Sequence, residues 1–206
     1  MKTCYTREQI ETAVKEKGYK WFEDNGNKGY DVNIVGVRNS KTKGRVTNAF
    51  DDCITISYKV DGEWQFHCIP CTTDPGSHWV ENILNEKGVA ILKPNQYRGS
   101  HKLRLHQGKY LALGQKKPMS IYRDANLDGK YDLIEESVRE ELIGINIHRA
   151  TSRAGGKSSR VDKWSAGCQV IADNDDWHEF LDICQAAREI HGNSFSYTLL
   201  ESKDIA

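Results

Sequence analysis

The decisive stretch is residues 143–172, which begins Ile143-Gly144-Ile145-Asn146-Ile147-His148 and ends Trp164-Ser165-Ala166-Gly167-Cys168-Gln169-Val170-Ile171-Ala172. Its first part alternates isoleucine with small or polar residues, the period of a strand that has one buried face. This alternation places Asn146 and His148 on the same face. Residues 151–160 lack apolar periodicity and are rich in turn formers, which predicts a mobile surface loop between the two parts.

Cys168 lies where a glycine-containing turn leads into an apolar strand. A thiol beside an imidazole can ionise near neutral pH, and the N–H groups of Gly167 and Cys168 can hold the oxyanion of an acyl-transfer intermediate. These residues therefore predict a minimal catalytic site, with Cys168 as nucleophile and His148 as base. The alternative is that Cys168 is a buried structural thiol and that His148 satisfies a core hydrogen bond.

His148, a loop and then Ser165-Ala166-Gly167-Cys168 resemble the signature of the L,D-transpeptidase catalytic domain, a histidine followed by Ser/Thr-His-Gly-Cys. The resemblance implies that Cys168 accepts an acyl group from a peptidoglycan stem peptide and that His148 is the general base. It also implies that the amides of Gly167 and Cys168 stabilise the oxyanion, and it makes Ser165 part of the catalytic turn. The resemblance covers residues 144–170.

The chain departs from this signature at Ala166, where the family has a second histidine, and at Gln169 and Val170. These departures leave the attacking Cys168 and the deprotonating His148 unchanged. They therefore predict a divergent branch of the family, in which Ala166 and Gln169 mark a pocket of different substrate specificity. The candidate substrate-binding residues are Asn146, Arg149, Trp164 and His106. A lone histidine in a strand, such as His106, is more often structural.

Residues 124–135 match the template of a calcium-binding loop. Oxygen side chains occupy its first, third, fifth, ninth and twelfth positions, and glycine occupies the sixth. The predicted structural calcium ligands are Asp124, Asn126, Asp128, the Lys130 carbonyl, Asp132 and Glu135. The preceding residues look extended, so we expect a strand, the loop and a short exit helix over residues 137–142. The alternative is an acidic turn without metal.

Six cysteines are scattered along the chain, at Cys4, Cys53, Cys68, Cys71, Cys168 and Cys184. Their spacing does not suggest a small disulfide scaffold, and free thiols are the expectation. Cys68 and Cys71, preceded by His67, permit a zinc or redox interpretation. The motif ends a strand and runs into a loop, however, and no second pair has matching spacing, which favours two strand-end thiols.

A chain of 206 residues predicts one domain, here 1–206. Its periodicity predicts a mainly β fold with peripheral helices, which the resemblance makes an L,D-transpeptidase-like β-sandwich with the calcium loop inserted. A helix within residues 1–18, capped by Thr6, and a helix over 174–191, capped by Asn174, flank several strands. Strands are expected at 19–22 and 30–37, and a hairpin at 54–69.

The chain has 29 basic residues (Lys and Arg) and 29 acidic residues (Asp and Glu). No overall positive charge therefore favours the binding of nucleic acid. No run is long enough to span a bilayer, and the N-terminus lacks the apolar region of a signal peptide. We expect a monomer made in the cytoplasm that acts on the cell wall, with a phage lysis or virion-associated route as one hypothesis.

The sequence thus predicts cysteine-dependent acyl transfer or hydrolysis on peptidoglycan peptides. Transfer and hydrolysis differ only in whether an amine or water attacks the thioester. Two alternatives stay open: a catalytically silent calcium-dependent binding module, and a thiol hydrolase with a substrate outside the wall.

Overall fold

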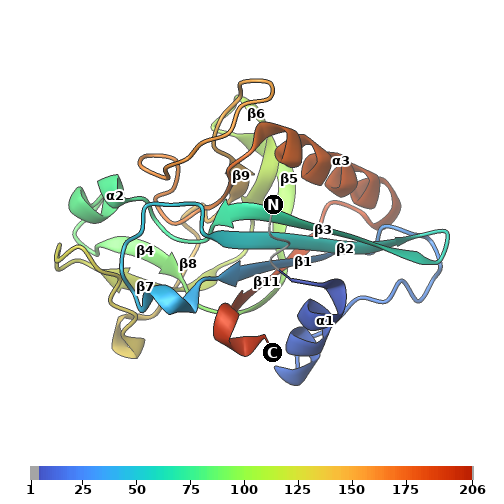
Figure 1. Cartoon of the computed structure of the whole chain (residues 1–206), viewed down its shortest axis with the longest axis horizontal. Helices are drawn as coiled ribbons and strands as arrows, with labels where there is room; N and C mark the ends of the chain where they lie inside the picture. Colours follow the sequence, from blue (N-terminus) through green and yellow to red (C-terminus); the bar gives the residue numbers. More distant parts are fainter. Residues whose placement is uncertain (1–4, 206) are drawn as a thin grey trace.

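The computed structural model describes residues 5–205, and its central feature is a closed barrel with the strand order β1-β11-β5-β6-β9-β10-β3-β2 (Figure 1). The barrel strands are β1 (Asn33–Arg38), β2 (Asp52–Val60), β3 (Glu63–Thr72), β5 (Asn95–His106), β6 (Tyr110–Gln115), β9 (Ile147–Arg149), β10 (Gln169–Ile171) and β11 (Phe195–Glu201). The pairs β1–β11 and β9–β10 are parallel, and the other pairs in the barrel are antiparallel. The mainly β prediction is confirmed, but the strands close into a barrel instead of forming a sandwich.

A second sheet, with the order β4-β7-β8, lies at one side of the barrel (Figure 1). It consists of β4 (Val89–Leu92), β7 (Met119–Asp124) and β8 (Arg139–Glu141). Neighbouring residues of β4 belong to different hydrophobic clusters: Leu92 packs with the barrel interior, and Ile91 packs with Val80 of the short helix α2 (Ser77–Glu81). Strand β4 is therefore buried on both faces, whereas β8 at the edge of the sheet is mostly exposed.

Two longer helices flank the β1–β2–β3 part of the barrel on opposite sides (Figure 1). Helix α1 (Arg7–Glu16) begins with the predicted Thr6 capping box, in which Gln9 is the partner. Helix α3 (Asn174–His191) has the predicted bounds, but its N-cap is Asp173 and not Asn174. Short 3-10 helices span Ser40–Thr42, Glu135–Ser137 and Ser202–Asp204. None of the helices within residues 5–205 is long and apolar enough to cross a membrane.

Strand β1 is buried along its whole length because the barrel interior covers one face and α1 covers the other. Ile34 belongs to the cluster inside the barrel, whereas Val35 and Val37 pack with α1. The predicted β2–β3 hairpin forms as expected. Residues 19–22, predicted to be a strand, form none, and Trp21 packs with α1 instead.

Gly36 faces the barrel interior where Tyr197 crosses it. A Cβ at this position would lie 1.9 Å from Tyr197 Oη. Tyr197 cannot easily shift, because its hydroxyl donates a 2.8 Å hydrogen bond to Gln169 Oε1. The close approach of β1 and β11 therefore requires glycine here.

We expect Gly36→Ala to lower the free energy of unfolding by about 1–3 kcal/mol through overpacking. Gly26→Ala is the matched control, because Gly26 has no positive φ and contacts only the flexible Lys28 side chain. Urea denaturation of both variants measures the difference. Equal stability of the two would contradict the packing described for the interior.

Candidate functional site

The parallel pairing of β9 with β10 brings the two predicted catalytic residues into one region. His148 pairs with Val170, two residues after Cys168. Ile147 and Ile171 point into the interior cluster, so the alternation of the strands turns His148 to the opposite face. The Gln169 N–H donates a 2.8 Å hydrogen bond to the Asn146 carbonyl, which fixes the start of β10 beside β9.

His148 and Cys168 line the same cavity, which has a volume of about 790 Å³. Its other lining residues are Trp79, Leu84, His106, Gln107, Lys109, Tyr110, Arg149, Ala150, Ser152, Lys163, Trp164 and Ala166. A smaller cavity of about 160 Å³ adjoins it and also reaches Cys168. Cys168 thus lies where two cavities meet.

The Cys168 thiol is partly exposed but held among backbone groups. Its Sγ donates a 3.3 Å hydrogen bond to the Gly144 carbonyl. Burial raises the pKa of Cys168 to about 11, against a smaller lowering by the Asn146 backbone N–H. The free protein therefore carries Cys168 as a neutral thiol at pH 7.

The His148 ring is 5% exposed, and one of its nitrogens is fixed by the main chain. Nδ1 lies 2.8 Å from the Arg149 carbonyl. A carbonyl can only accept, so Nδ1 carries the hydrogen and Nε2 remains as the basic nitrogen. Burial is the main cause that lowers the pKa of His148 to about 4; the bond to the Arg149 carbonyl opposes this shift, and the neighbouring His106 adds to it. His148 is thus a neutral imidazole over the physiological range.

The turn before Cys168 requires glycine and is closed by Ser165. Gly167 has φ +125°, and a Cβ there would lie 2.6 Å from the Ala90 carbonyl oxygen. Ser165 Oγ accepts from the Gly167 N–H at 3.1 Å and donates to the Cys168 carbonyl at 2.8 Å. The Gly167 N–H, expected in the oxyanion hole, is therefore already engaged. Within residues 5–205, no hydrogen bond engages the Cys168 N–H.

The four predicted substrate-binding residues divide into two groups. Arg149, Trp164 and His106 line the large cavity. The Arg149 guanidinium lies over the Tyr110 ring at 4.4 Å, and its side chain donates to Asn174 Oδ1 at 3.3 Å. The guanidinium is thus held in place at the cavity wall.

Asn146 does not line the large cavity. Its Oδ1 accepts from the Gln115 N–H at 2.9 Å, and its Nδ2 lies 3.2 Å from His106 Nδ1. His106 in turn stacks on His148 with ring centroids 4.4 Å apart. Asn146 therefore braces His106, which holds the plane of the His148 ring.

Of the two residues predicted to mark a different pocket, Ala166 and Gln169, only Ala166 lines a cavity. Ala166 lines both cavities. Gln169 is fully buried, with Oε1 bonded to Tyr197 and Nε2 donating to the Gly167 carbonyl at 3.3 Å. The interpretation of Gln169 as a pocket residue is wrong, because the strand alternation turns it into the barrel.

Several wall residues were not predicted from the sequence. Trp79 comes from α2, and its Nε1 donates to the Lys163 carbonyl at 3.1 Å. Lys109 lies in the β5–β6 turn, Tyr110 begins β6, and Leu84 follows α2. No local pattern marks these residues, although tryptophan in a short polar segment is a weak signal for a binding surface.

The loop predicted to be mobile is held to the barrel at several points. Ser158 donates to the Ala172 carbonyl at 3.0 Å, and Asn174 donates to the Gly156 carbonyl at 2.9 Å. Val161 is buried, and its N–H donates to the Asn48 carbonyl at 3.1 Å. These contacts fix the path that returns the chain to Cys168.

The other cysteines give a mixed outcome. Cys53, Cys71 and Cys184 are free and buried, as expected. Cys68 is disulfide-bonded, so the expectation of a free thiol there is wrong, and with Cys71 free the two form no redox pair with each other. Cys4 lies outside the described residues.

Side-chain oxygens of the predicted calcium loop accept hydrogen bonds from backbone N–H groups of the same loop. Asp124 Oδ1 accepts from the Asn126 N–H at 3.3 Å, and Asn126 Oδ1 accepts from the Asp128 N–H at 3.1 Å. Asp128 Oδ1 accepts from the Lys130 N–H at 2.9 Å. The first half of the loop is thus wound into successive turns.

The end of the loop is arranged differently. The Asp132 N–H donates to Asp124 Oδ2 at 3.2 Å, but the Glu135 carboxylate binds Lys93 Nζ at 2.5 Å and Tyr122 Oη at 3.1 Å. Within residues 5–205, no three His, Cys, Asp or Glu side chains gather closely enough to hold a metal ion. Lys93 therefore competes with any cation for Glu135.

The exit helix predicted over residues 137–142 is wrong. Strand β8 forms there and pairs with β7. An ion pair of 2.5 Å between Arg123 and Glu141 joins the two strands. Sheet pairing overrides the local helix propensity of Arg-Glu-Glu-Leu because the edge of β7 offers unpaired backbone groups.

A chain of hydrogen bonds connects the predicted calcium loop to the turn before Cys168. Tyr131 Oη donates a 2.5 Å hydrogen bond to the Pro75 carbonyl, and the next residue, Gly76, donates its N–H to the Ser165 carbonyl at 2.8 Å. A Cβ at Gly76 would lie 2.0 Å from the Asp162 carbonyl oxygen. Residues 75–76 therefore link the loop to the turn that presents Cys168.

Comparison of the chain with protein-family models, curated proteins and solved structures gave no significant match.

We expect alkylation by iodoacetamide to be selective for Cys168 in the folded protein. Among the free cysteines of residues 5–205, Cys168 alone is partly exposed. Burial raises the pKa of Cys53 to about 12, above that of Cys168 at about 11, so the thiolate fraction also favours Cys168. Peptide mass mapping over time measures the order of modification.

The rate at Cys168 should rise with pH up to about 11, since the thiolate is the reacting form. Unfolding in denaturant provides the control, because it should make all free cysteines react at similar rates. Faster modification of Cys53 or Cys184 in the folded protein would contradict the described exposure.

Proposed function

We propose that the protein is a cysteine acyl-enzyme, and the observation that supports this most directly is that Cys168 and His148 line one cavity. In the proposed reaction, Cys168 Sγ attacks a substrate carbonyl while His148 Nε2 takes the thiol proton. The tetrahedral intermediate then expels an amine, which takes the proton from His148, and a thioester remains. Water or a second amine attacks the thioester and restores the thiol.

The electrostatics favour proton transfer during attack, not beforehand. Burial keeps the Cys168 thiol and the His148 imidazole neutral in the free protein, with pKa values of about 11 and about 4. The charged pair therefore arises as the carbon–sulfur bond forms, when the developing oxyanion needs a donor. The Cys168 N–H is the proposed donor, because Ser165 already engages the Gly167 N–H.

The cavity wall supports an anionic, peptide-like substrate. Lys109, Arg149 and Lys163 line the large cavity, and no Asp or Glu is among its lining residues. Trp79 and Trp164 add apolar surface at the same wall. Carboxylate-bearing peptidoglycan stem peptides fit this chemistry, and they are the substrates that the resemblance to L,D-transpeptidases implies. The proposed site of action is accordingly the cell wall.

We expect Cys168→Ala to lower acyl-enzyme formation by at least about three orders of magnitude, and His148→Ala to lower it by about two to four. Purified peptidoglycan is incubated with each protein and its peptides are analysed by mass spectrometry. Cross-linked products indicate transfer, and shortened free peptides indicate hydrolysis. Trapping by a carbapenem, read out by intact mass, should label wild type and not Cys168→Ala.

The matched histidine control is His178→Ala, because His178 is exposed on α3 and does not line the cavity. The acylation rate should stay level above pH 5 and fall as the pH drops towards about 4, since protonated His148 cannot accept the thiol proton. Full turnover by Cys168→Ala, or a rate that rises with an apparent pKa near 7, would contradict the mechanism.

We also propose that residues 124–135 bind calcium and that the metal has a structural role. The successive turns through Asp124, Asn126 and Asp128 and the glycine at Gly129, with φ +78°, support this proposal. Glu135 would complete the site by leaving Lys93. Calcium would then stiffen the link through Tyr131 to the Cys168 turn.

We expect calcium to raise the melting temperature, chelator to lower it, and magnesium to substitute poorly because it prefers a tighter shell. Asp128→Ala should abolish binding at about millimolar calcium. Lys93→Gln should tighten calcium binding a few-fold, because it releases Glu135 from a weak surface ion pair. Calorimetry measures the affinities.

The matched control is Glu136→Gln, which removes an exposed carboxylate next to Glu135. No heat of binding at about millimolar calcium, together with a melting temperature that chelator does not change, would leave the loop as an acidic turn.

A further inference from the structure

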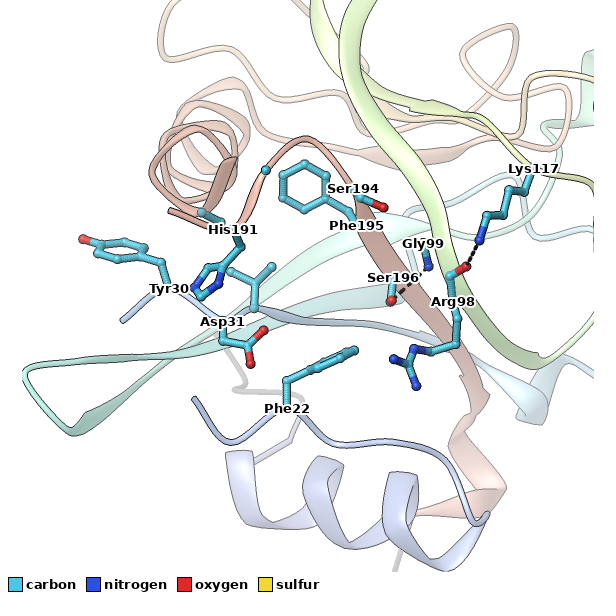
Figure 2. A pocket seen from close by; sticks show the side chains of 13 residues that line it. Phe22, Tyr30, Asp31, Arg98, Gly99, Lys117, His191, Ser194, Phe195 and Ser196 are labelled. Atoms are coloured by element: carbon cyan, nitrogen blue, oxygen red, sulfur yellow. Dashed lines mark hydrogen bonds between the residues drawn. The ribbon is translucent and has the colours of Figure 1, made fainter. Parts of the chain in front are cut away.

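A further cavity, of about 340 Å³, shares no lining residue with the two cavities at Cys168 and is drawn in Figure 2. It is lined by Phe22, Tyr30, Asp31, Val32, Arg98, Gly99, Lys117, Ala187, His191, Gly192, Ser194, Phe195 and Ser196. Arg98 is near the start of β5, and His106 of the candidate catalytic cavity ends the same strand. Eight residues of extended chain correspond to about 25 Å. The two cavities are therefore separate sites.

This cavity carries opposite charges that do not pair with each other. Figure 2 shows Asp31 and Arg98 on opposite sides of the Phe22 ring. Lys117 adds a second cation beside Arg98, because its Nζ donates to the Arg98 carbonyl at 3.0 Å. None of the ion pairs within residues 5–205 includes Asp31, Arg98 or Lys117.

The Asp31 carboxylate is partly buried at one side of the cavity. Burial raises the pKa of Asp31, with a smaller rise from the Asp24 carboxylate, and His191, the Asp24 backbone N–H and Lys20 oppose this rise only in part. His191 Nε2 is bonded to the Gly29 carbonyl at 2.7 Å, so the ring is anchored to the main chain. A half-buried carboxylate without a paired cation is costly, and a ligand ammonium group would relieve this cost.

The opposite wall is shaped by a β-bulge. Gly99 has φ +57°, and the β11–β5 register shifts between Phe195 and Tyr197. The Gly99 N–H leaves the ladder and donates to Ser196 Oγ at 3.0 Å. Bulges redirect neighbouring side chains, and here the Arg98 guanidinium lies 5.1 Å from the centroid of the Phe22 ring.

We propose that this cavity binds a small zwitterion, namely a dipeptide with free termini. Its ammonium group would bind Asp31, its carboxylate would bind Arg98 and Lys117, and its apolar side chains would pack on Phe22 and Phe195. A volume of about 340 Å³ suits a ligand of this size, at the lower end of small-molecule pockets. The proposal does not depend on the catalytic function of Cys168.

The first test compares three probes on the wild-type protein by calorimetry: leucyl-leucine, N-acetyl-leucyl-leucine and leucyl-leucine amide. The free dipeptide should bind at least about tenfold more tightly than either blocked form, since each blocked form loses one charge-assisted contact. Absence of binding by the free dipeptide up to about 10 mM, or equal affinity for all three probes, overturns the proposal.

The second test assigns the contacts to residues. Asp31→Asn should remove the preference for the free amine, and Arg98→Gln should weaken the preference for the free carboxylate. The matched controls are Asp182→Asn and Lys102→Gln, exposed residues of α3 and β5 that do not line the cavity. If Asp31→Asn and Arg98→Gln leave dipeptide binding unchanged, the dipeptide binds elsewhere on the protein, and the proposal is overturned.

Discussion

The parallel pairing of β9 with β10 is the constraint on which the candidate catalytic site depends. Parallel neighbours cannot be joined by a tight hairpin, so the chain needs a long connection between them. Residues 150–168 supply it, and their contacts with the barrel bring the chain back at the required register. His148 at one strand and Cys168 before the other thereby face the same cavity.

The barrel interior supports this pairing with polar contacts as well as apolar packing. The Gln169 side chain accepts a hydrogen bond from the Tyr197 hydroxyl and donates one to the Gly167 carbonyl in the turn before Cys168. Because Tyr197 occupies the space that a side chain at Gly36 would need, the parallel β1–β11 pair and the β9–β10 pair are connected across the interior. The shape of the barrel and the position of Cys168 are therefore not independent.

Buried ionic contacts fix the segment that supports the turn before Cys168. Arg38 Nε lies 2.8 Å from Asp74 Oδ1, and Asp52 Oδ2 accepts from the Thr73 N–H at 2.7 Å. These contacts hold residues 72–74, directly before the Gly76 N–H that binds Ser165. Charged groups are costly to bury unless paired, so loss of one member should disturb its neighbours. The barrel core and the Cys168 turn meet at this segment.

The sequence by itself determined the local elements. Thr6 and Gln9 cap α1, helical spacing defines α3, and strict alternation defines the β2–β3 hairpin, because each depends on residues close together in the chain. The sequence also singled out Cys168 and His148, whose chemistry is visible without coordinates. Only the tertiary structure decided that the sheet closes, that β8 replaces a helix, and that Glu135 binds Lys93. It alone turned Gln169 inwards and separated Asp31 from Arg98 across a cavity. These outcomes depend on partners distant in sequence, and local propensity carries no information about them.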